Sequence, residues 1–193
     1  MKDTLRTFVA VETSDPVHRR AVELIRAVDV AEADVKWVQP QNMHLTLKFL
    51  DEVPLVEIPR VSEMVAQAAA GSEPFELEIR GAGAFPSAGR PRTVWLGAVD
   101  GAEPLRTLQK MLEKSLAKLG FRKEPRRFEP HLTIGRVRGG GPGVVELGRR
   151  LKEHADFAAG RFMVTELVVF SSQLTPSGPI YEALSRTRLG VVA

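Results

Sequence analysis

The sequence predicts an α+β fold with two pseudo-symmetric lobes that derive from a duplicated β-α-β-α-β-β unit. Three observations support this prediction. Segments that alternate apolar and polar residues are interspersed with segments of helical periodicity. The tripeptide His-Leu-Thr occurs twice, 87 positions apart (131 minus 44). The length of 193 residues, 44% of them hydrophobic, suits one bilobal domain over residues 1–193.

The chain starts with an expected strand and an expected helix. Residues 6–12, "RTFVAVE", alternate as a half-buried strand does. Residues 14–16, "SDP", then supply an N-cap and a first turn that favour a helix. The apolar face of this helix consists of Val17, Ala21, Leu24, Ile25 and Val28.

The first copy continues with a strand, a helix and a strand. Residues 43–50, "MHLTLKFL", alternate without interruption, and residues 75–81, "FELEIRG", alternate again. Between these two strands, an alanine-rich stretch over residues 57–70 predicts a helix that ends at Gly71.

The second copy repeats this order of elements. Residues 92–99 predict a strand, and residues 103–119 predict a long helix that stops at Gly120. The apolar stripe of this helix consists of Leu105, Leu108, Leu112, Leu116 and Leu119. The remaining expected elements are a strand over 131–137, a helix over 144–155 and strands over 161–170 and 180–189, with loops at 122–127 and 139–143.

The shift of 87 residues aligns more than the two tripeptides. It carries helix 17–30 onto 104–117, helix 57–70 onto 144–157, and Phe75 onto Phe162. We interpret the pattern as a tandem duplication with copies over about residues 6–99 and 92–188. Two copies related by a pseudo-two-fold axis bring equivalent strands to face each other across a groove. No linker-like boundary separates the copies, so we expect them to share one body.

Each tripeptide places a histidine and a threonine on the same face of its strand. Side chains alternate along a strand, so His44, Thr46 and Lys48 are expected to point away from the core. The core face of that strand consists of Met43, Leu45, Leu47 and Phe49. In the second copy His131 and Thr133 share one face in the same way. Each His–Thr pair is separated by about 6 to 7 Å along its strand, which suits binding of a small tetrahedral anion.

Two histidines in one groove indicate acid–base chemistry at phosphorus. Imidazole has an ordinary pKa near 6.5, so one ring can accept a proton while the other donates one. Threonine hydroxyls can bind the non-bridging oxygens. This chemistry needs no metal and no cofactor, and the absence of cysteine excludes a thiol nucleophile and thiolate zinc sites. A zinc site is the weaker alternative, because His18 and His154 lie in expected helices without metal-site spacing.

Other side chains have two interpretations each. Lys48 would neutralise phosphate from the His44 face, or be an ordinary exposed strand lysine. Arg136 has the opposite parity to His131 and reaches the groove only if Gly135 makes a bulge or the strand ends there. Four aromatic residues would either stack a base or lie in the core, namely Phe8, Trp37, Trp95 and Phe128.

The charge pattern favours a polyanionic partner, although only mildly. The chain has 27 Lys and Arg against 24 Asp and Glu, a net charge of +3. Eight basic residues crowd its middle third, and they either bind phosphates or form solvated loops. These are Arg90, Arg92, Arg122, Lys123, Arg126, Arg127, Arg136 and Arg138. No apolar run approaches the roughly 18 residues of a membrane span, so we expect a cytoplasmic monomer without membrane contact.

The two motifs "HLTL" (44–47) and "HLTI" (131–134) resemble the paired His-x-Thr-x signature of the two-histidine (2H) phosphoesterase superfamily. The blocks "RTFVAVE", "HLTLKFL", "RTVWLG" and "FEPHLTIGR" are similar to its RNA 2′,3′-cyclic phosphodiesterase branch, also called 2′-5′ RNA ligase. The match covers essentially the whole chain. One departure is "KFLDE" where the family commonly has "KFLG", and we expect Asp51 to lie past the catalytic strand.

The resemblance implies two antiparallel sheets around a cleft and hydrolysis of RNA 2′,3′-cyclic phosphate ends to 2′-phosphomonoesters. It implies that His131 is the proton acceptor, that His44 is the proton donor, and that Thr46 and Thr133 hold the phosphate. Reverse 2′-5′ ligation would use the same chemistry. Two alternatives remain: a 2H enzyme for 2′-5′ oligonucleotides or a cyclic nucleotide sugar phosphate, and a noncatalytic RNA-binding module.

Overall fold

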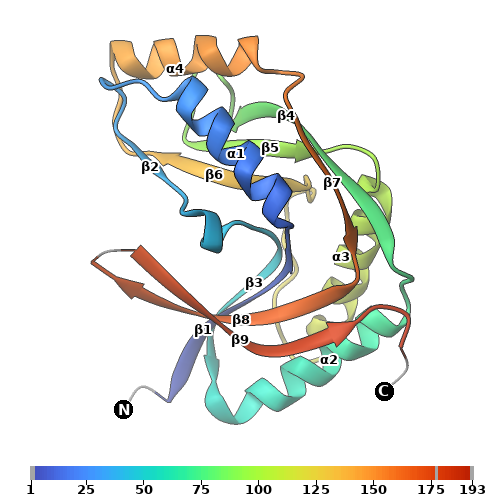
Figure 1. Cartoon of the computed structure of the whole chain (residues 1–193). Coiled ribbons are helices and arrows are strands. Elements are labelled where there is room, and N and C mark those ends of the chain that lie inside the picture. Colours follow the sequence, from blue (N-terminus) through green and yellow to red (C-terminus); the bar gives the residue numbers. More distant parts are fainter. Residues whose placement is uncertain (1–2, 177, 192–193) are drawn as a thin grey trace.

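A computed structural model describes residues 3–176 and 178–191 and confirms the predicted α+β fold (Figure 1). The strands are β1 (Thr4–Glu12), β2 (Val35–Trp37), β3 (His44–Pro54), β4 (Phe75–Phe85), β5 (Thr93–Ala98), β6 (His131–Val137), β7 (Ala158–Val164), β8 (Glu166–Thr175) and β9 (Gly178–Arg188). The α-helices are α1 (Asp15–Val28), α2 (Ile58–Ala70), α3 (Ala102–Ala117) and α4 (Pro142–Glu153). Two short 3-10 helices are η1 (Pro40–Asn42) and η2 (Leu55–Glu57). Within the described ranges, no helix is long and apolar enough to cross a bilayer.

The strands form two antiparallel sheets. The four-stranded sheet has the order β3-β1-β8-β9, and the five-stranded sheet has the order β2-β6-β5-β4-β7. The two tripeptides open β3 and β6, which belong to different sheets and nevertheless contact each other. The fold therefore brings the two motifs together where the sheets meet.

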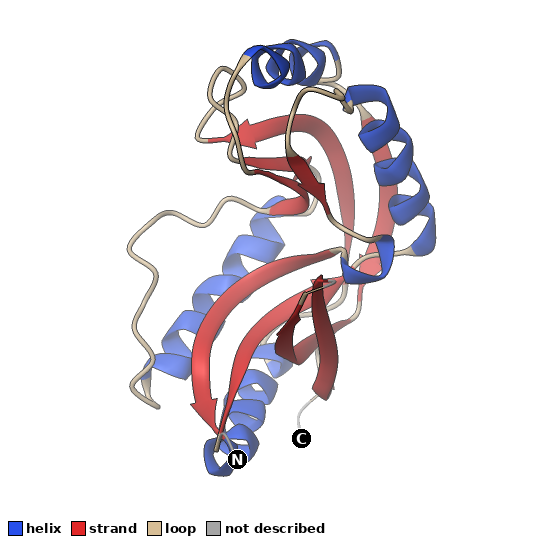
Figure 2. Cartoon of the chain, turned by 90° about the vertical axis from the view of Figure 1, so that its left-hand side faces the viewer, coloured by secondary structure: helices blue, strands red, loops and turns tan. Residues whose placement is uncertain are grey.

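The helices cover the outer side of each sheet, as Figure 2 shows. α2 packs against β8, β9 and α3, and α3 also contacts β3 and β4. α1 packs against β7 and α4, and α4 contacts β4. The helix α1 follows a strand of the four-stranded sheet but covers the five-stranded sheet, and α3, which follows β5, contacts one strand of each sheet. Each lobe therefore contains elements from both halves of the chain.

One large apolar core joins the sheets and the helices. The predicted faces of α1 and α3 supply many of its fully buried side chains: Val17, Ala21, Leu24, Val28, Leu105, Leu108, Leu112 and Leu116. Each such leucine stabilises the fold by about 1.5–3 kcal/mol relative to an exposed one. A second, smaller cluster lies on the other face of the four-stranded sheet and consists of Phe8, Ala10, Val168 and Phe170, with Tyr181 packed against it.

The structure differs from the sequence prediction at several elements. The expected strand over residues 161–170 is two strands, because β7 ends at Val164 and β8 starts in the other sheet at Glu166. Periodicity did not reveal this change of sheet because apolar residues run through both strands. The strand β2 was not predicted, since three residues are too few to show alternation.

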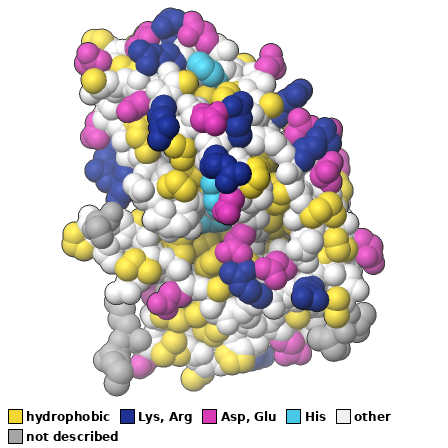
Figure 3. All heavy atoms as spheres, viewed as in Figure 1, with side chains coloured by type: hydrophobic (Ala, Val, Ile, Leu, Met, Phe, Trp, Pro, Cys, Tyr) yellow, Lys and Arg dark blue, Asp and Glu magenta, His cyan; other side chains and the backbone are white. Residues whose placement is uncertain are grey.

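Charged side chains of both signs are interspersed over the face of the molecule shown in Figure 3. Many charged side chains of the described residues form ion pairs, such as Arg186 with Glu12 and Glu166 on neighbouring strands. Exposed pairs of this kind contribute little to stability. The net positive charge therefore does not form a continuous basic surface on this face.

Candidate active site

The two histidines occupy equivalent places, since His44 is the first residue of β3 and His131 is the first residue of β6. Both side chains are partly exposed. The guanidinium of Arg136 is close enough to lower the pKa of both rings. The structure thus places His44, His131 and Arg136 in one electrostatic neighbourhood.

Each histidine ring is held by the backbone two residues before it. The Nδ1 atom of His131 lies 2.7 Å from the carbonyl oxygen of Glu129, and His44 makes a hydrogen bond with the backbone of Asn42. A carbonyl oxygen only accepts, so neutral His131 carries its proton on Nδ1. The Nε2 atom of His131 is then left with a free lone pair, as a general base requires.

Aromatic rings surround His44 on the face that carries the smaller cluster. The Phe8 ring is stacked on His44 with a centroid distance of 4.8 Å, and the Tyr181 ring meets it edge-on at 5.2 Å. Phe8 was a candidate for base stacking, but it is 3% exposed and packs under His44 instead. In the other sheet, Phe85 meets His131 edge-on at 5.0 Å. The aromatic neighbours of each imidazole thus come from one sheet.

This packing changes the acid–base properties of the histidines. Burial is the largest cause that lowers the pKa of His44, to about 4, and Arg136 adds to this effect. The backbone of Asn42 and the carboxylate of Glu12 act in the opposite direction. Burial, again with Arg136, also lowers the pKa of His131. In the unliganded protein both rings are therefore mainly neutral near pH 7.

The two threonines follow their histidines at the predicted spacing. Thr46 and Thr133 are partly exposed, and between each pair lies a fully buried leucine that faces the core, Leu45 or Leu132. Among the described residues, neither threonine hydroxyl has a hydrogen-bond partner. Both hydroxyls are therefore available to a ligand.

The expectation that Lys48 shares the face of His44 is wrong. In the pairing of β1 with β3, Ala10 lies opposite Thr46 and Val9 lies opposite Lys48, so Leu47 is an extra residue. This bulge reverses the alternation. Lys48 is 6% exposed on the helix side of the sheet, and Phe49 is 58% exposed on the His44 face.

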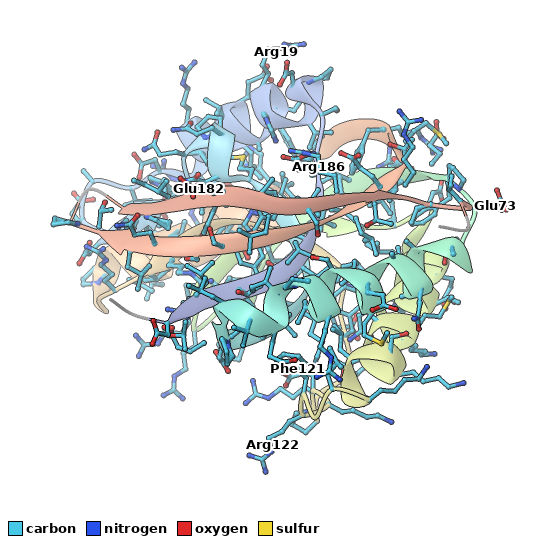
Figure 4. All side chains as sticks on the ribbon, turned by 90° about the horizontal axis from the view of Figure 1, so that it is seen from below. Arg19, Glu73, Phe121, Arg122, Glu182 and Arg186 are labelled. Atoms are coloured by element: carbon cyan, nitrogen blue, oxygen red, sulfur yellow. The ribbon has the colours of Figure 1, made fainter. Side chains whose placement is uncertain are left out.

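The ammonium group of Lys48 makes two contacts in that position. It lies 2.9 Å from Glu113 Oε1 of α3 and donates to the carbonyl oxygen of Arg122 at 2.8 Å. The side chain of Arg122 points away from the molecule beyond α2 and α3 (Figure 4). Lys48 therefore joins β3 to α3 and to the following basic loop, and it does not lie beside the histidines.

β6 contains the bulge that Arg136 needs in order to share the face of His131. Val94 pairs with Gly135 and Trp95 pairs with Thr133, which leaves Ile134 as an extra residue in β6. This bulge restores Arg136 to an exposed position on the His131 side. A side chain at Gly135 would collide with the Trp37 ring, at 2.6 Å from its Cβ position. Trp37 is thus a packing residue of β2 and β6.

The other two histidines have separate roles. The His18 Nε2 atom lies 2.6 Å from Thr13 Oγ1, and the His154 Nδ1 atom lies 2.9 Å from the carbonyl oxygen of Arg150 at the end of α4. In the part of the chain that the structure describes, no three His, Asp or Glu side chains gather as metal ligands would. Neither His18 nor His154 joins the site.

Several residues of the site were missed by the sequence reasoning. Tyr181 and Phe170 reach His44 from β9 and β8, and Phe85 reaches His131 from β4. Each of these residues lies more than 40 positions from the histidine that it contacts, as the residue numbers show. No local pattern in the sequence signals such contacts, because they depend on the order of strands in each sheet.

Comparison with known proteins places this arrangement in a family. The model of the 2′-5′ RNA ligase superfamily matches residues 8–175. RNA 2′,3′-cyclic phosphodiesterases from Methanothermobacter thermautotrophicus and Thermotoga maritima are 38% and 35% identical to the chain. The first alignment covers 96% of this chain and 99% of the relative, and the second covers 93% of each.

Solved structures have the same fold. The crystal structure of TT0787 from Thermus thermophilus superposes with a TM-score of 0.81 at 28% identity. That of E. coli LigT complexed with 3′-AMP superposes with a TM-score of 0.77 at 25% identity. Each comparison covers 96% of this chain and 98% of the other. The chain therefore belongs to the 2′-5′ RNA ligase superfamily, as its paired motifs predicted.

Proposed function

We propose that the protein is an RNA 2′,3′-cyclic phosphodiesterase that hydrolyses terminal cyclic phosphates to 2′-phosphomonoesters. Relatives at 29–38% identity bear that name. The observation that carries the proposal is the placement of two histidines, each fixed by a backbone carbonyl, around one arginine. This arrangement supplies a base, an acid and a cation for one phosphate group.

The reaction assigns a different proton transfer to each histidine. The Nε2 atom of His131 removes a proton from water, and the water oxygen attacks phosphorus. The bond between phosphorus and the 3′-oxygen breaks, and His44 protonates the leaving 3′-oxygen. The product carries a 2′-phosphate and a free 3′-hydroxyl group.

The phosphate itself is held by neutral and charged groups. Thr46 and Thr133 donate hydrogen bonds to the non-bridging oxygens, and Arg136 stabilises the charge that develops in the transition state. Lys48 is left out of this site because its ammonium group is buried against Glu113. On the His44 face, the exposed Phe49 and the partly exposed Tyr181 offer ring surfaces to the nucleobase.

The lowered pKa of His44 is compatible with an acid role only when substrate is bound. A phosphate anion beside an imidazole favours the charged form and raises its pKa. The substrate thus supplies the negative charge that allows His44 to hold a proton. We infer that His44 is largely unprotonated in the free enzyme and that it gains a proton when the substrate binds.

Reverse ligation is the second candidate activity, by microscopic reversibility. A 5′-hydroxyl group would take the place of water, and hydrolysis dominates unless the second RNA end is held nearby. A protein that acts on 2′-5′ oligonucleotides or cyclic nucleotide sugar phosphates, or that only binds RNA, would not hydrolyse a cyclic phosphate end. A cytoplasmic monomer that acts on RNA remains our expectation for the cellular state.

The test is hydrolysis of an oligonucleotide ending in 2′,3′-cyclic phosphate, with EDTA present and the products separated by chromatography. We expect turnover in EDTA, a 2′-phosphate product, and losses of about 10² to 10⁴ for His44→Ala and His131→Ala. His154→Ala is the matched control, because the ring of His154 contacts the carbonyl oxygen of Arg150 at the end of α4. Wild-type turnover by folded His131→Ala would refute the mechanism, and activity that required a divalent ion would favour the zinc alternative.

A further inference from the structure

Arg6 of β1 is a basic residue on the His44 face that the proposed mechanism does not use. Side chains alternate along β1, and Thr7 and Val9 are buried on the helix side of the sheet, so Arg6 shares the other face with Phe8. Arg6 is exposed, and among the residues that the structure describes its guanidinium has no ion-pair or hydrogen-bond partner. Within that part of the chain, this group is available to an anion on the His44 face.

Tyr181 of β9 lies at the same level of the sheet as Arg6. In the register of β1 with β8, Thr7 lies opposite Ser171. The neighbouring residues along the two strands, Arg6 and Ser172, are therefore level with each other. Ser172 pairs with Tyr181 in β9. Two strand spacings, about 10 Å, thus separate the backbones of Arg6 and Tyr181, and the short side chain of Ser172 leaves room between these two long ones.

The hydroxyl group of Tyr181 is close to two arginines. Burial raises the pKa of Tyr181, whereas the positive charges of Arg136 and Arg6 both lower it. This hydroxyl has no hydrogen-bond partner over residues 3–176 and 178–191. The ring that carries it meets His44 edge-on. Tyr181 therefore connects the catalytic site, where Arg136 lies, with Arg6 further along the same face.

An RNA substrate brings a second anion to this face. The terminal nucleotide carries the cyclic phosphate on one side of its ribose and, on its 5′ side, the phosphate that joins it to the rest of the chain. In the proposed reaction the leaving 3′-oxygen lies beside His44, and the exposed Phe49 ring on the same face is available to the base. The 5′-phosphate then lies over the four-stranded sheet, away from His131 and the attacking water.

We propose that Arg6 and the hydroxyl group of Tyr181 bind the phosphate on the 5′ side of the terminal nucleotide. This inference rests on the proposed function and names the contact that distinguishes an RNA end from a free nucleoside 2′,3′-cyclic phosphate. The planar guanidinium of Arg6 can donate two parallel hydrogen bonds to phosphate oxygens, and the Oη atom of Tyr181 donates a third. Neither residue takes part in the proton transfers, so this site determines substrate preference.

The competing interpretation is that Arg6 serves a carboxylate of its own sheet. Glu52 of β3 lies opposite Arg6 in the pairing of β1 with β3. The carboxylate of Glu52 accepts a hydrogen bond from Thr4 Oγ1 at 2.8 Å, and no ion pair joins it to Arg6 in the described ranges. A substitution at Glu52 therefore separates the two interpretations.

The first experiment compares two substrates that differ by one phosphate, adenosine 2′,3′-cyclic phosphate with and without a 5′-phosphate. In the wild-type protein the 5′-phosphate should raise kcat/KM about 10-fold, because a hydrogen bond to a charged group has that value. Arg6→Gln should bring the ratio of the two kcat/KM values to about 1. Arg19→Gln is the matched control, because Arg19 is an exposed arginine that projects from α1, away from Arg6 (Figure 4), and should leave the ratio at the wild-type value.

Two further variants test the parts of the site. Tyr181→Phe keeps the ring and removes only the hydroxyl, and should lower the ratio about 3-fold, since a neutral hydrogen bond contributes less than a charged one. Glu52→Gln should not lower the ratio. A wild-type ratio in Arg6→Gln or in Tyr181→Phe would overturn the proposal, and so would a ratio of about 1 in Glu52→Gln.

The second experiment measures salt dependence. A contact with one phosphate of a single strand adds about 0.7 to the slope of log kcat/KM against log salt concentration. The wild-type slope should be steeper by this amount for the 5′-phosphorylated substrate, and the two slopes should be equal in Arg6→Gln. Equal slopes in the wild-type protein would overturn the proposal.

The outcomes separate this inference from the proposed function. Hydrolysis of both substrates by the wild-type protein with equal kcat/KM would refute the second phosphate site and leave the phosphodiesterase intact. Hydrolysis of neither substrate would refute the proposed function itself. Calorimetric titration with 2′-AMP and adenosine 2′,5′-bisphosphate tests the site without turnover: the bisphosphate should bind the wild-type protein about 10-fold more tightly, and Arg6→Gln should bind both equally. Equal affinities in the wild-type protein would overturn the proposal.

Discussion

At the scale of single residues, the chemistry depends on how burial and charge act on His44 and His131. Stacking against Phe8 removes water from His44, and Arg136 adds a positive charge near both rings. Both effects disfavour imidazolium. The unliganded site is therefore a neutral pair beside one cation, which is suited to receive an anion.

The first residue-scale prediction concerns the pH dependence of the rate. The profile of kcat/KM reports the free enzyme, in which the pKa values of both histidines are lowered, and the profile of kcat reports the complex, in which the phosphate raises them. The bell-shaped profile of kcat should therefore have its optimum at higher pH than that of kcat/KM. The limbs belong to the coupled pair rather than to either residue.

Steady-state kinetics over about pH 4 to 9, together with NMR titration of the ring signals, measure this shift. Inorganic phosphate should move the titration of His44 from about 4 towards neutral pH. His154, which lies outside the site, provides the internal control. Coincident optima, or a His44 signal that does not respond to phosphate, would contradict the electrostatic explanation.

The second residue-scale prediction concerns the threonine hydroxyls. Thr46→Val and Thr133→Val keep the shape of the side chain and remove one hydrogen bond to the phosphate. Each should lower kcat/KM about 10-fold, since ~1.4 kcal/mol is the usual value of such a bond. Thr187→Val, six residues beyond Tyr181 on β9 and opposite Leu167 of β8, is the matched control. A wild-type value of kcat/KM in both variants would remove the hydroxyls from phosphate binding.

The sequence predicted for a physical reason that the two histidines and two threonines of the motifs face the site. Alternation over His44 to Leu47 and over His131 to Ile134 is regular, so the faces follow from the strand period alone. Lys48 was misplaced because a bulge is a property of the paired strand as well, and the β1 partner is not visible in the local pattern.

At the scale of elements, the β3 bulge determines which side chains serve the site and which serve the core. It turns Phe49 towards the face of His44 and Lys48 towards α3. Lys48 and Glu113 then form a buried ion pair, to which Gln109 of α3 adds a hydrogen bond at 3.2 Å. Such a pair joins elements specifically, but it depends on both partners being present.

The element-scale prediction is that Lys48 is structural. Lys48→Met leaves the Glu113 carboxylate buried without its cation and should lower the free energy of unfolding by about 3–5 kcal/mol. Adding Glu113→Leu should recover most of the lost free energy of unfolding, because an apolar pair of similar volume is tolerated. Lys36→Met, at an exposed lysine of β2, should change stability by less than about 0.5 kcal/mol.

Urea denaturation measures these differences, and kinetics at increasing salt distinguish the two interpretations of Lys48. A phosphate-binding lysine would give a Lys48→Met variant whose KM is raised and loses its salt dependence. We expect wild-type salt dependence in the folded variant. A stable Lys48→Met protein with impaired substrate binding would contradict the structural role and show that Lys48 binds the substrate.

The elements themselves were predictable to different degrees. Helices α1 and α3 carry long apolar stripes, and their buried faces match the expected residues, except that Ile25 is only partly buried and Leu119 lies beyond the end of α3. The boundary between β7 and β8 was not predictable, because the chain changes sheets within a continuous apolar pattern and only the strand order reveals it. Strand order depends on contacts between distant segments, which a local pattern does not contain.

At the scale of the whole molecule, the placement of α1 and α3 couples the two sheets. The five-stranded sheet is covered by α1, which follows β1 of the other sheet, and α3, which follows β5, packs on α2 and contacts one strand of each sheet, β3 and β4. Neither lobe can complete its core from one half of the chain. We therefore expect the two copies inferred from the sequence, about residues 6–99 and 92–188, to form one cooperative unit rather than two independent domains.

Cooperativity can be measured because both tryptophans report on one lobe. Trp37 in β2 and Trp95 in β5 belong to the five-stranded sheet, whereas far-UV circular dichroism follows both lobes. Leu167→Ala empties a fully buried position of β8, in the four-stranded sheet, and should cost about 2–5 kcal/mol. If the lobes unfold together, this change lowers the urea midpoint seen by tryptophan fluorescence as much as the midpoint seen by circular dichroism. A fluorescence midpoint that stays at the wild-type value while the dichroism midpoint falls would show that the lobes unfold separately, and the two histidines would then be held together by contacts weaker than the shared core.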